Sequence, residues 1–366
     1  MLSAVAFGAG PAGIATAIAA TLKGLRVEVV DCRKPPIAKA CGEGLLPGAV
    51  ANLAALSVKL DSCHGYPFRG ISFLDQESST SARISHGTGY GVRRSTLHSL
   101  LVERAGELGV TFKWGARVTG FDTRGAFVDG LRTTYKWLVG ADGQNSRVGR
   151  WAGLNSKRPR LSRFGFSRHY GVSPWTDLVE VHWGPGCQMF VTPTADNEVC
   201  VALLSHDPGL RIERGLVHFP AVAKRLNGVH PRTVELGSVT ALGRARRVVS
   251  ANVALVGDAS FTVDGIAGLG LSLAFEQAIL VAEAIAREDL NCYEAAHSEI
   301  SAAPWRMTRL LLLMDQSAWV RRKVLRLFAR KPALFSKMMS AHMSQTMNES
   351  LDATEMLGLG WQVLRA

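Results

Sequence analysis

The sequence has few cysteines, and none of them lies close to another. The six are Cys32, Cys41, Cys63, Cys187, Cys200 and Cys292. Zinc sites use closely spaced cysteine pairs, and disulfide frameworks belong to small secreted chains. Neither pattern is present, so we expect reduced thiols and no metal centre.

Long apolar runs are also lacking. The longest candidate, 310–314, is flanked by Arg309 and Asp315, whereas a membrane-spanning helix needs about 20 apolar residues. A buried-strand pattern begins at Ala4, which leaves no room for a signal peptide before it. We therefore expect a cytoplasmic protein that does not span a bilayer.

Acidic residues are fewer than basic residues. The 366 residues include 42 Lys and Arg against 30 Asp and Glu, a formal net charge of +12. Aromatic and basic residues do not alternate as in a nucleic-acid module, so no nucleic-acid partner is expected. Basic residues gather in the leucine-rich segment 305–343, at Arg306, Arg309, Arg321, Arg322, Lys323, Arg326, Arg330 and Lys331. This composition suits peripheral membrane association or a lid, and equally a solvated packing helix.

A glycine-rich turn near the start is the first motif with a chemical role. Residues 4–31 have the pattern strand, turn, helix, strand, with Gly8, Gly10 and Gly13 in the turn and Asp31 ending the second strand. These glycines allow a tight turn and a close approach of backbone N–H groups to a pyrophosphate, and the acid can bind a ribose. The segment predicts a dinucleotide-binding βαβ unit.

Three later segments place polar groups where predicted strands end or helices begin. Arg93 and Arg94 precede a helix expected over 95–108, and Asp-Gly and Gly-Asp pairs at 142–143 and 257–258 follow predicted strands. Open α/β sheets bind ligands at the carboxyl ends of their strands. Asp142 fits a plain turn cap as well.

At these motifs the sequence resembles the FAD-binding family shared by aromatic-ring hydroxylases, flavin-dependent halogenases and geranylgeranyl reductases. The matching segments are 8–13, 94–97, 140–146 and 257–259. The resemblance implies an α/β fold in which a Rossmann-like FAD-binding domain of the GR2 type carries an inserted antiparallel β-sheet substrate domain and C-terminal helices. We expect the FAD-binding domain over 1–73, 90–160 and 249–300, the substrate sheet over 74–89 and 161–248, and the helical region over 301–366.

The resemblance also implies residue roles. Asp31 binds the adenosine ribose, Arg94 approaches the phosphates with Arg93 as the alternative, and Asp258 contacts the ribityl chain. The loop 265–270 brings N–H groups to the flavin. The full set expected at the cofactor is Gly8, Gly10, Pro11, Ala12, Gly13, Asp31, Cys32, Arg33, Cys41, Gly42, Arg94, Val118, Asp142, Gly143, Gly257, Asp258, Gly268, Leu269 and Gly270.

The sequence departs from the hydroxylase pattern at two points. The hydroxylases carry an arginine directly after the valine of the Asp-Gly motif, but here Gly149 separates Val148 from Arg150. This leaves NAD(P)H open as the external reductant. Ser260 stands where many hydroxylases have histidine, and the loop 39–45 resembles the geranylgeranyl reductase branch. Halogenase hallmarks are missing, so halogenation ranks last.

Residues 164–248 alternate as short antiparallel strands and supply the expected substrate contacts. These are Arg168, Tyr170, His182, Met189, Val191 and Pro193. His182 is a catalytic candidate that can orient a hydroxyl, although a lone strand histidine is more often structural. Cys41 is the second catalytic candidate, as a proton donor beside the flavin, and a small buried hydrophobe is its alternative role.

The sequence favours an FAD-dependent monooxygenase of secondary metabolism. It hydroxylates an apolar aromatic or polyketide-like molecule with O₂, through a flavin hydroperoxide, and the cofactor performs the difficult step. The first alternative is a flavin-dependent reductase that saturates a C=C bond of a lipophilic substrate, as geranylgeranyl reductases do. The second alternative is a non-catalytic, membrane-associated flavin-binding protein.

Overall fold

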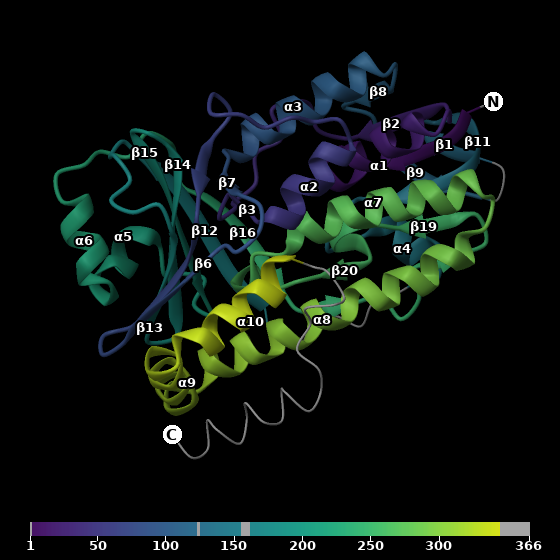
Figure 1. Ribbon diagram of the computed structural model, residues 1–366. Helices are drawn as coiled ribbons and strands as arrows, with labels where there is room; N and C mark the ends of the chain where they lie inside the picture. The colour runs from purple at the N-terminus through teal and green to yellow at the C-terminus, as the bar shows by residue number, and fades with distance from the viewer. Residues whose placement is uncertain (1, 123–124, 155–161, 345–366) are drawn as a thin grey trace.

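Two large sheets, the helices packed around them and a set of C-terminal helices make up most of the fold (Figure 1). The computed structural model describes residues 2–122, 125–154 and 162–344. The first sheet has eight strands and the second has seven. Together they form the mixed α/β fold that the sequence predicted.

The first sheet has a parallel centre, in the order β18-β19-β11-β1-β2-β8. Its strands are β1 (Leu2–Phe7), β2 (Val27–Asp31), β8 (Thr111–Trp114), β9 (Val118–Phe121), β10 (Gly125–Val128), β11 (Leu131–Gly140), β18 (Val249–Ser250) and β19 (Val253–Leu255). All of β2 is buried, as expected for a strand covered on both faces. The carboxyl ends of β1, β2, β11 and β19 meet along one edge.

Helices pack on this sheet and on one another. They are α1 (Pro11–Leu22), α2 (Pro47–Ala55), α3 (Arg94–Glu107) and α7 (Gly270–Ala286), with the short α4 (Arg147–Trp151) after β11. The alanine-rich α1 begins with Pro11 at its first position, where a missing N–H costs nothing. Its small side chains let α1 pack closely along α7.

The second sheet is mainly antiparallel, in the order β16-β12-β15-β14-β13-β5-β6. Its strands are β5 (Gly70–Leu74), β6 (Ser79–Arg83), β12 (Ser162–Tyr170), β13 (Val179–Gly184), β14 (Cys187–Ala195), β15 (Glu198–Ser205) and β16 (Leu236–Ala241). One face packs against α5 (Ile212–Gly215), η1 (Leu216–His218) and α6 (Pro220–Leu226). The expected segment break at 73/74 falls inside β5, because this sheet begins at Gly70; the break at 160/161 lies outside the described residues.

Two small sheets and two short turns of helix join the larger units. The strands are β3 (Gly44–Leu45), β4 (Tyr66–Phe68) and β7 (Gly89–Gly91) in one sheet, and β17 (Gly243–Arg244) with β20 (Phe261–Thr262) in the other. The turns are η2 (Gly257–Ala259) and η3 (Gly265–Ala267), which precede α7.

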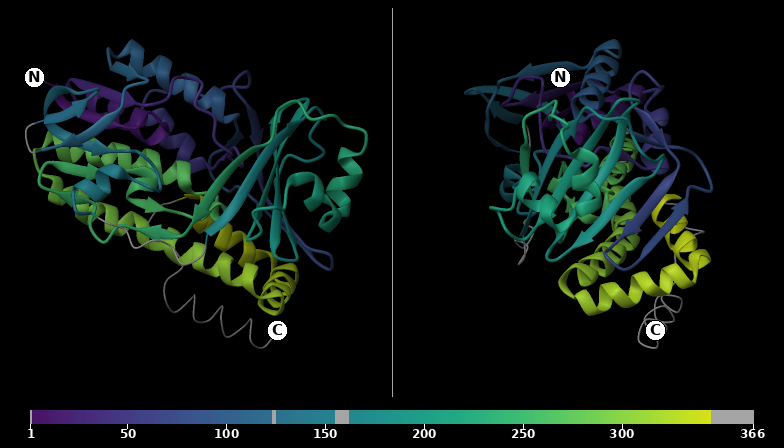
Figure 2. Two further views of the ribbon diagram at one scale, coloured as in Figure 1. Left: turned by 180° about the vertical axis from the view of Figure 1, so that it is seen from behind. Right: turned by 90° about the vertical axis from the view of Figure 1, so that its left-hand side faces the viewer.

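The C-terminal helices bridge both sheets (Figure 2). They are α8 (Leu290–Gln316), α9 (Ala318–Arg330) and α10 (Pro332–Ser344). Helix α8 packs along α7, and α9 and α10 then contact β6 of the second sheet. The expected break at 300/301 therefore falls inside α8. Among the helices of the described ranges, none has the length and apolar character to cross a membrane.

Candidate functional site

A cavity of about 880 Å³ lies between the edge of the first sheet and one face of the second. It is lined by the glycine turn after β1, the loop 39–46, the strand ends at 141–143 and 257–258, the segment 262–268, and residues of β5, β12, β13, β14, β15 and β16. Most of the expected cofactor residues therefore meet in one place.

The three glycines of the first turn have different surroundings. Gly8 has a φ of +109°, and a Cβ on it would lie 2.3 Å from the Ala141 carbonyl oxygen. A Cβ on Gly13 would lie 1.9 Å from the Gly8 oxygen, so Gly13 lies behind the turn, outside the cavity lining. Gly10 lines the cavity, and a Cβ there would meet no protein atom within 4 Å. Gly8 and Gly13 shape the turn, while Gly10 keeps space open at the start of α1.

Asp31 holds this turn from the end of β2. Its Oδ2 accepts the Ala9 N–H at 2.8 Å, and its Oδ1 accepts the Arg33 N–H at 2.8 Å. Asp31, Cys32, Arg33 and Val118 all line the cavity. A carboxylate fixed in this way beside a helix N-terminus suits a ribose next to a pyrophosphate.

His98 supports the same turn, and it was not predicted at the site; its place one helical turn after Arg94 is the one signal that could have indicated it. Its Nε2 lies 2.9 Å from the Ala9 carbonyl oxygen. Burial lowers the pKa of His98, and the hydrogen bond to Ala9 partly opposes this shift. The ring therefore stays neutral at physiological pH and contributes shape without charge.

The structure separates the two neighbouring arginines. Arg93 pairs through its guanidinium with buried Glu198 on β15, with Nε donating to Oε1 at 2.7 Å. Arg94 lines the cavity, and its Nε is buried without a hydrogen-bond partner within the described residues. An unpartnered guanidinium N–H at the cavity wall suits a phosphate oxygen.

Asp142 and Gly143 line the cavity, but the Asp142 carboxylate is used inside its own turn. It accepts the N–H of Arg147 at 2.7 Å and that of Val148 at 3.1 Å, and the Ser146 hydroxyl donates to it at 2.6 Å. The geometry is that of a cap over α4. Gly143, with a φ of +81°, forms the corner beside it.

The corner at Gly257 brings a carboxylate to the cavity wall. Gly257 has a φ of +59° and donates its N–H to Gln277 Oε1 at 2.6 Å. The following Asp258 lines the cavity and pairs with Lys39 Nζ at 3.0 Å. Lys39, which lies in the expected loop but was not predicted at the site, therefore orients Asp258.

The segment before α7 lines the cavity with backbone. Asp264 accepts the Ile266 N–H at 3.0 Å, and Gly268 adopts a φ of +66°. Gly268 and Gly270 line the cavity, whereas Leu269 is 2% exposed and packs in the core. The N-terminus of a 17-residue helix thus faces the cavity and favours negative charge there.

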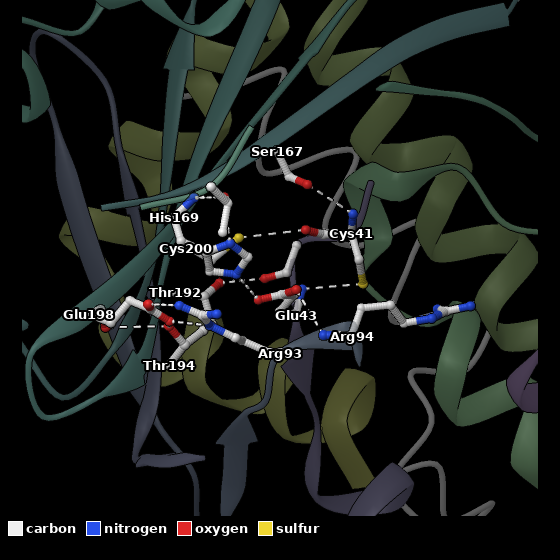
Figure 3. Close-up of polar contacts among 12 residues, drawn as sticks. Cys41, Glu43, Arg93, Arg94, Ser167, His169, Thr192, Thr194, Glu198 and Cys200 are labelled. Atoms are coloured by element: carbon white, nitrogen blue, oxygen red, sulfur yellow. Dashed lines mark hydrogen bonds and ion pairs between the residues drawn. The ribbon is translucent and has the colours of Figure 1, made fainter. Parts of the chain in front are cut away.

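Cys41 lies at the junction of the cofactor region and the second sheet (Figure 3), and both Cys41 and the following Gly42 line the cavity. The Cys41 N–H donates to Ser167 Oγ at 3.2 Å, and its sulfur accepts the Glu43 N–H at 3.3 Å. Burial raises the pKa of the Cys41 thiol, although Arg94 opposes the shift. Cys41 therefore presents a protonated thiol at the cavity wall.

The six expected substrate residues are not among the residues that line the cavity, and their role in substrate binding stays a prediction. Side chains alternate between the two faces of a strand. Along β14, Phe190 and Thr192 face the cavity, whereas Met189 and Val191 pack in the core below α5 and α6. Pro193, Arg168, Tyr170 and His182 are likewise absent from the lining.

The polar residues among them have partners outside the cavity. Arg168 pairs with Glu213 at 2.8 Å, and His182 Nε2 lies 2.9 Å from Glu180 Oε2. Tyr170 is buried in the core cluster of this outer face. His182 therefore pairs with Glu180 away from the cavity lining, and its catalytic role stays a prediction.

The features together fit FAD. Gly10 leaves open space at a helix N-terminus, and Arg94 offers a buried Nε–H with no partner in the part of the chain that the structure describes. Carboxylates at Asp31 and Asp258 suit hydroxyl groups. Fold and site define a dinucleotide-binding protein of the flavoprotein class.

Comparison with known proteins assigns the family. The family model described as FAD binding domain matches residues 2–307. The chain belongs to this family, and it is an FAD-dependent oxidoreductase with FAD as its cofactor. Because the chain is an oxidoreductase, the second alternative from the sequence, a non-catalytic flavin-binding protein, is wrong.

The curated relatives and the similar solved structures are named for different reactions. The chain is 28% identical over 318 residues to digeranylgeranylglycerophospholipid reductase 1 of Methanococcoides burtonii, covering 78% of this chain and 76% of that one. It is 27% identical over 314 residues to menaquinone reductase of Mycobacterium tuberculosis, covering 78% and 77%. The solved flavin-dependent brominase Bmp2 matches with a TM-score of 0.75 at 19% identity, covering 100% of both chains. That last likeness shows the fold alone, because one fold hosts many reactions.

Proposed function

We propose that the protein is a reductase that saturates a C=C bond of a lipophilic substrate. The observation that carries this proposal is the apolar chamber into which the cavity extends beyond the cofactor residues. Its walls include Leu46, Phe68, Ile71, Phe73, Val179, Val181, Phe190, Leu204, Ile266, Leu311 and Met339. Such a chamber suits a hydrocarbon chain. The names of the curated relatives, a digeranylgeranylglycerophospholipid reductase and a menaquinone reductase, support the same substrate class.

The cofactor residues have distinct tasks in this proposal. The turn at Gly8, Gly10, Pro11 and Ala12 binds the FAD pyrophosphate, with Arg94 on its phosphates. Asp31 binds the adenosine ribose beside Cys32, Arg33 and Val118, and Asp258 with Lys39 binds the ribityl chain. The backbone at Gly268 and Gly270 stabilises negative charge at the flavin ring.

Cys41 supplies the proton. Reduced FAD held by these residues would supply the hydride for one carbon of the double bond, and the other carbon needs a proton. The S–H bond of Cys41 breaks as the new C–H bond forms, and solvent protons restore the thiol. Its raised pKa keeps the proton in place until the substrate arrives.

We also propose contact with an anionic lipid surface through α8 and α9. Leu311 of α8 lines the chamber, so the helices that carry the basic residues also form a wall of the substrate site. Trp319 and Leu313 are 51% and 49% exposed, and Lys323 Nζ lies 4.8 Å from the centroid of the Trp319 ring. Exposed tryptophan beside basic residues suits a membrane interface. Flotation with vesicles containing phosphatidylglycerol tests this contact, and equal flotation with neutral vesicles contradicts it.

Product analysis tests the reaction. The FAD-loaded protein, reduced with dithionite without oxygen, is incubated with a geranylgeranyl phospholipid, a menaquinone and a set of phenols. We expect a mass gain of two hydrogens in an isoprenoid product, and its loss in the Cys41→Ala variant. Hydroxylation, the reaction that the sequence analysis favours, requires oxygen. It would give a product that contains ¹⁸O from ¹⁸O₂ in place of two added hydrogens. An ¹⁸O-labelled product without anaerobic turnover overturns the reductase proposal. Parallel runs with NADPH and NADH identify the reductant.

A further inference from the structure

A buried polar cluster lies directly behind Cys41 (Figure 3). Glu43 is 5% exposed and lines the cavity. Its backbone has a φ of +60°, which residues other than glycine rarely adopt. Its Oε1 accepts the Arg94 N–H at 2.8 Å, and its Oε2 lies 2.6 Å from His169 Nε2. Backbone strain of this kind persists only where the surroundings fix it. Both carboxylate oxygens of Glu43 are thus held in place.

His169 continues the connection away from the cavity. It lies on β12, and its Nδ1 is 3.1 Å from the Thr233 hydroxyl. Thr233 is half-buried, between the exposed Arg232 and Val234. Glu43, His169 and Thr233 therefore form a continuous hydrogen-bonded path from the cavity wall to the surface.

We propose that Glu43 and His169 form a proton relay that restores the proton of the cavity acid Cys41 after each turnover. The proposal rests on the reductase function given above. His169 passes its Nε2 proton to the Glu43 carboxylate, the Glu43 carboxyl thus formed protonates the Cys41 thiolate, and Nδ1 takes up a proton from solvent through Thr233. The ring then returns to its first tautomer. One proton from solvent enters for each proton that the substrate carbon receives.

The electrostatics of Cys41 support the coupling. The negative charge of Glu43 raises the pKa of the Cys41 thiol, in addition to the larger effect of burial. The two residues line one wall of the cavity, and the Glu43 N–H donates to the Cys41 sulfur. A carboxylate that accepts a proton from His169 is placed to neutralise a new thiolate beside it.

Other charged and titratable groups surround the dyad. Arg94 and Arg93 approach from the start of α3, and Glu198 and Cys200 approach from β15. Arg93 and Glu198 pair with each other, and Arg232 lies 3.7 Å from Glu198. The charges of Arg93 and Glu198 offset each other, Arg94 and Arg232 remain as cations, and the Glu43–His169 pair forms the connection to the cavity.

A bound metal ion is the alternative use of these side chains. The ligand atoms of Glu43, His169 and Cys200 lie within 4.8 Å of one another. In the structure the hydrogen bond between Glu43 and His169 occupies two of these three groups. Stoichiometric zinc in the purified protein, found by mass spectrometry, overturns the relay.

The kinetic experiment compares two buried glutamates of this region. Glu43→Gln keeps an oxygen to accept the Arg94 N–H but cannot transfer a proton. Glu198→Gln is the control, since Glu198 is 2% exposed and does not line the cavity. We expect Glu43→Gln to lower kcat by about 100-fold, the usual size of a general acid contribution, with FAD content and KM unchanged and an altered pH profile. A kcat within twofold of the wild type, or a change in KM alone, overturns the proposal.

Two further measurements keep the test decisive. If Glu43→Gln loses FAD or does not fold, His169→Gln is judged by the same criteria. Independently of turnover, the rate of Cys41 alkylation by iodoacetamide is followed against pH in a variant whose other cysteines are serines. We expect Glu43→Gln, but not Glu198→Gln, to alkylate several-fold faster at neutral pH. An unchanged rate overturns the relay, whereas a wild type that reduces no substrate but shows this change overturns the reductase function alone.

Discussion

Arg163 donates a hydrogen bond from Nη1 to Oδ1 of Asp264 at 2.9 Å, and the two side chains are 1% and 2% exposed. The pair joins β12 of the second sheet to the segment that lines the cavity before α7. Asp315 of α8 adds a second carboxylate, 3.5 Å from Arg163 Nε. One buried guanidinium therefore fixes the cavity segment to both the second sheet and the C-terminal helices.

Removing this guanidinium should destabilise the protein strongly. Arg163→Met leaves the buried Asp264 carboxylate without its cation, while Asp315 still lies 2.9 Å from His206 Nε2. Breaking a buried pair in this way costs about 3–5 kcal/mol. Urea unfolding of the FAD-loaded protein measures the change. Arg83→Met is the control, because Arg83 pairs at 2.8 Å with Asp177 at the surface, where a pair contributes about 0–1 kcal/mol. Equal losses in the two variants contradict the prediction.

The glycines of the first turn should separate folding from cofactor binding. Gly10→Ala places a methyl group where the protein leaves open space, so the apoprotein should keep its Tm while FAD binding is lost. Gly13→Ala places a Cβ 1.9 Å from the Gly8 oxygen and should lower the Tm of the apoprotein. Calorimetry gives the Tm and flavin fluorescence titration gives the affinity. A Gly10→Ala protein that binds FAD normally refutes the assignment of this turn to the pyrophosphate.

Arg94 should contribute to FAD affinity through its free Nε. A hydrogen bond to a charged group contributes about 1.5–3 kcal/mol, so Arg94→Met should raise the Kd for FAD by about 10- to 100-fold. Arg104→Met is matched on the same helix, where Arg104 pairs with Glu107 at 2.8 Å. The Kd for FAD should also rise more steeply with salt concentration in the wild type and in Arg104→Met, which retain Arg94, than in Arg94→Met. If both variants bind FAD equally, Arg94 does not contact the cofactor.

The cofactor half of the site could be predicted because its signals are local. Gly8, Gly10 and Asp31 lie within one strand–helix–strand unit, whose geometry follows from chain connectivity. The choice between Arg93 and Arg94 needed the structure, because Glu198, which pairs with Arg93, is more than one hundred residues further along the chain.

The substrate half could not be predicted for two physical reasons. The period of a strand is two, so a sequence shows that Met189 and Phe190 face opposite ways but not which of them faces the cofactor. Core packing under α5 and α6 decides this, and it turns Met189 inward. The contact of Glu43 with His169 joins a loop to a strand 126 residues away, and no local pattern encodes it.

Glu276 on α7 should make stability depend on pH. Burial raises the pKa of this carboxyl from 4.5 to about 7. The folded state binds the proton of Glu276 more tightly than the unfolded state does. The contribution of the protonated Glu276 carboxyl to the free energy of unfolding is therefore fully present below pH 4.5 and is lost as pH rises through 7. Glu276→Gln removes this penalty and should stabilise the protein by about 1–3 kcal/mol at pH 8, with little effect at pH 4.5. Glu283→Gln is the control on the same helix, where the side chain is 43% exposed and pairs with Lys23. Urea unfolding at both pH values decides the matter, and an equal gain at both would show that Glu276 does not titrate in this way.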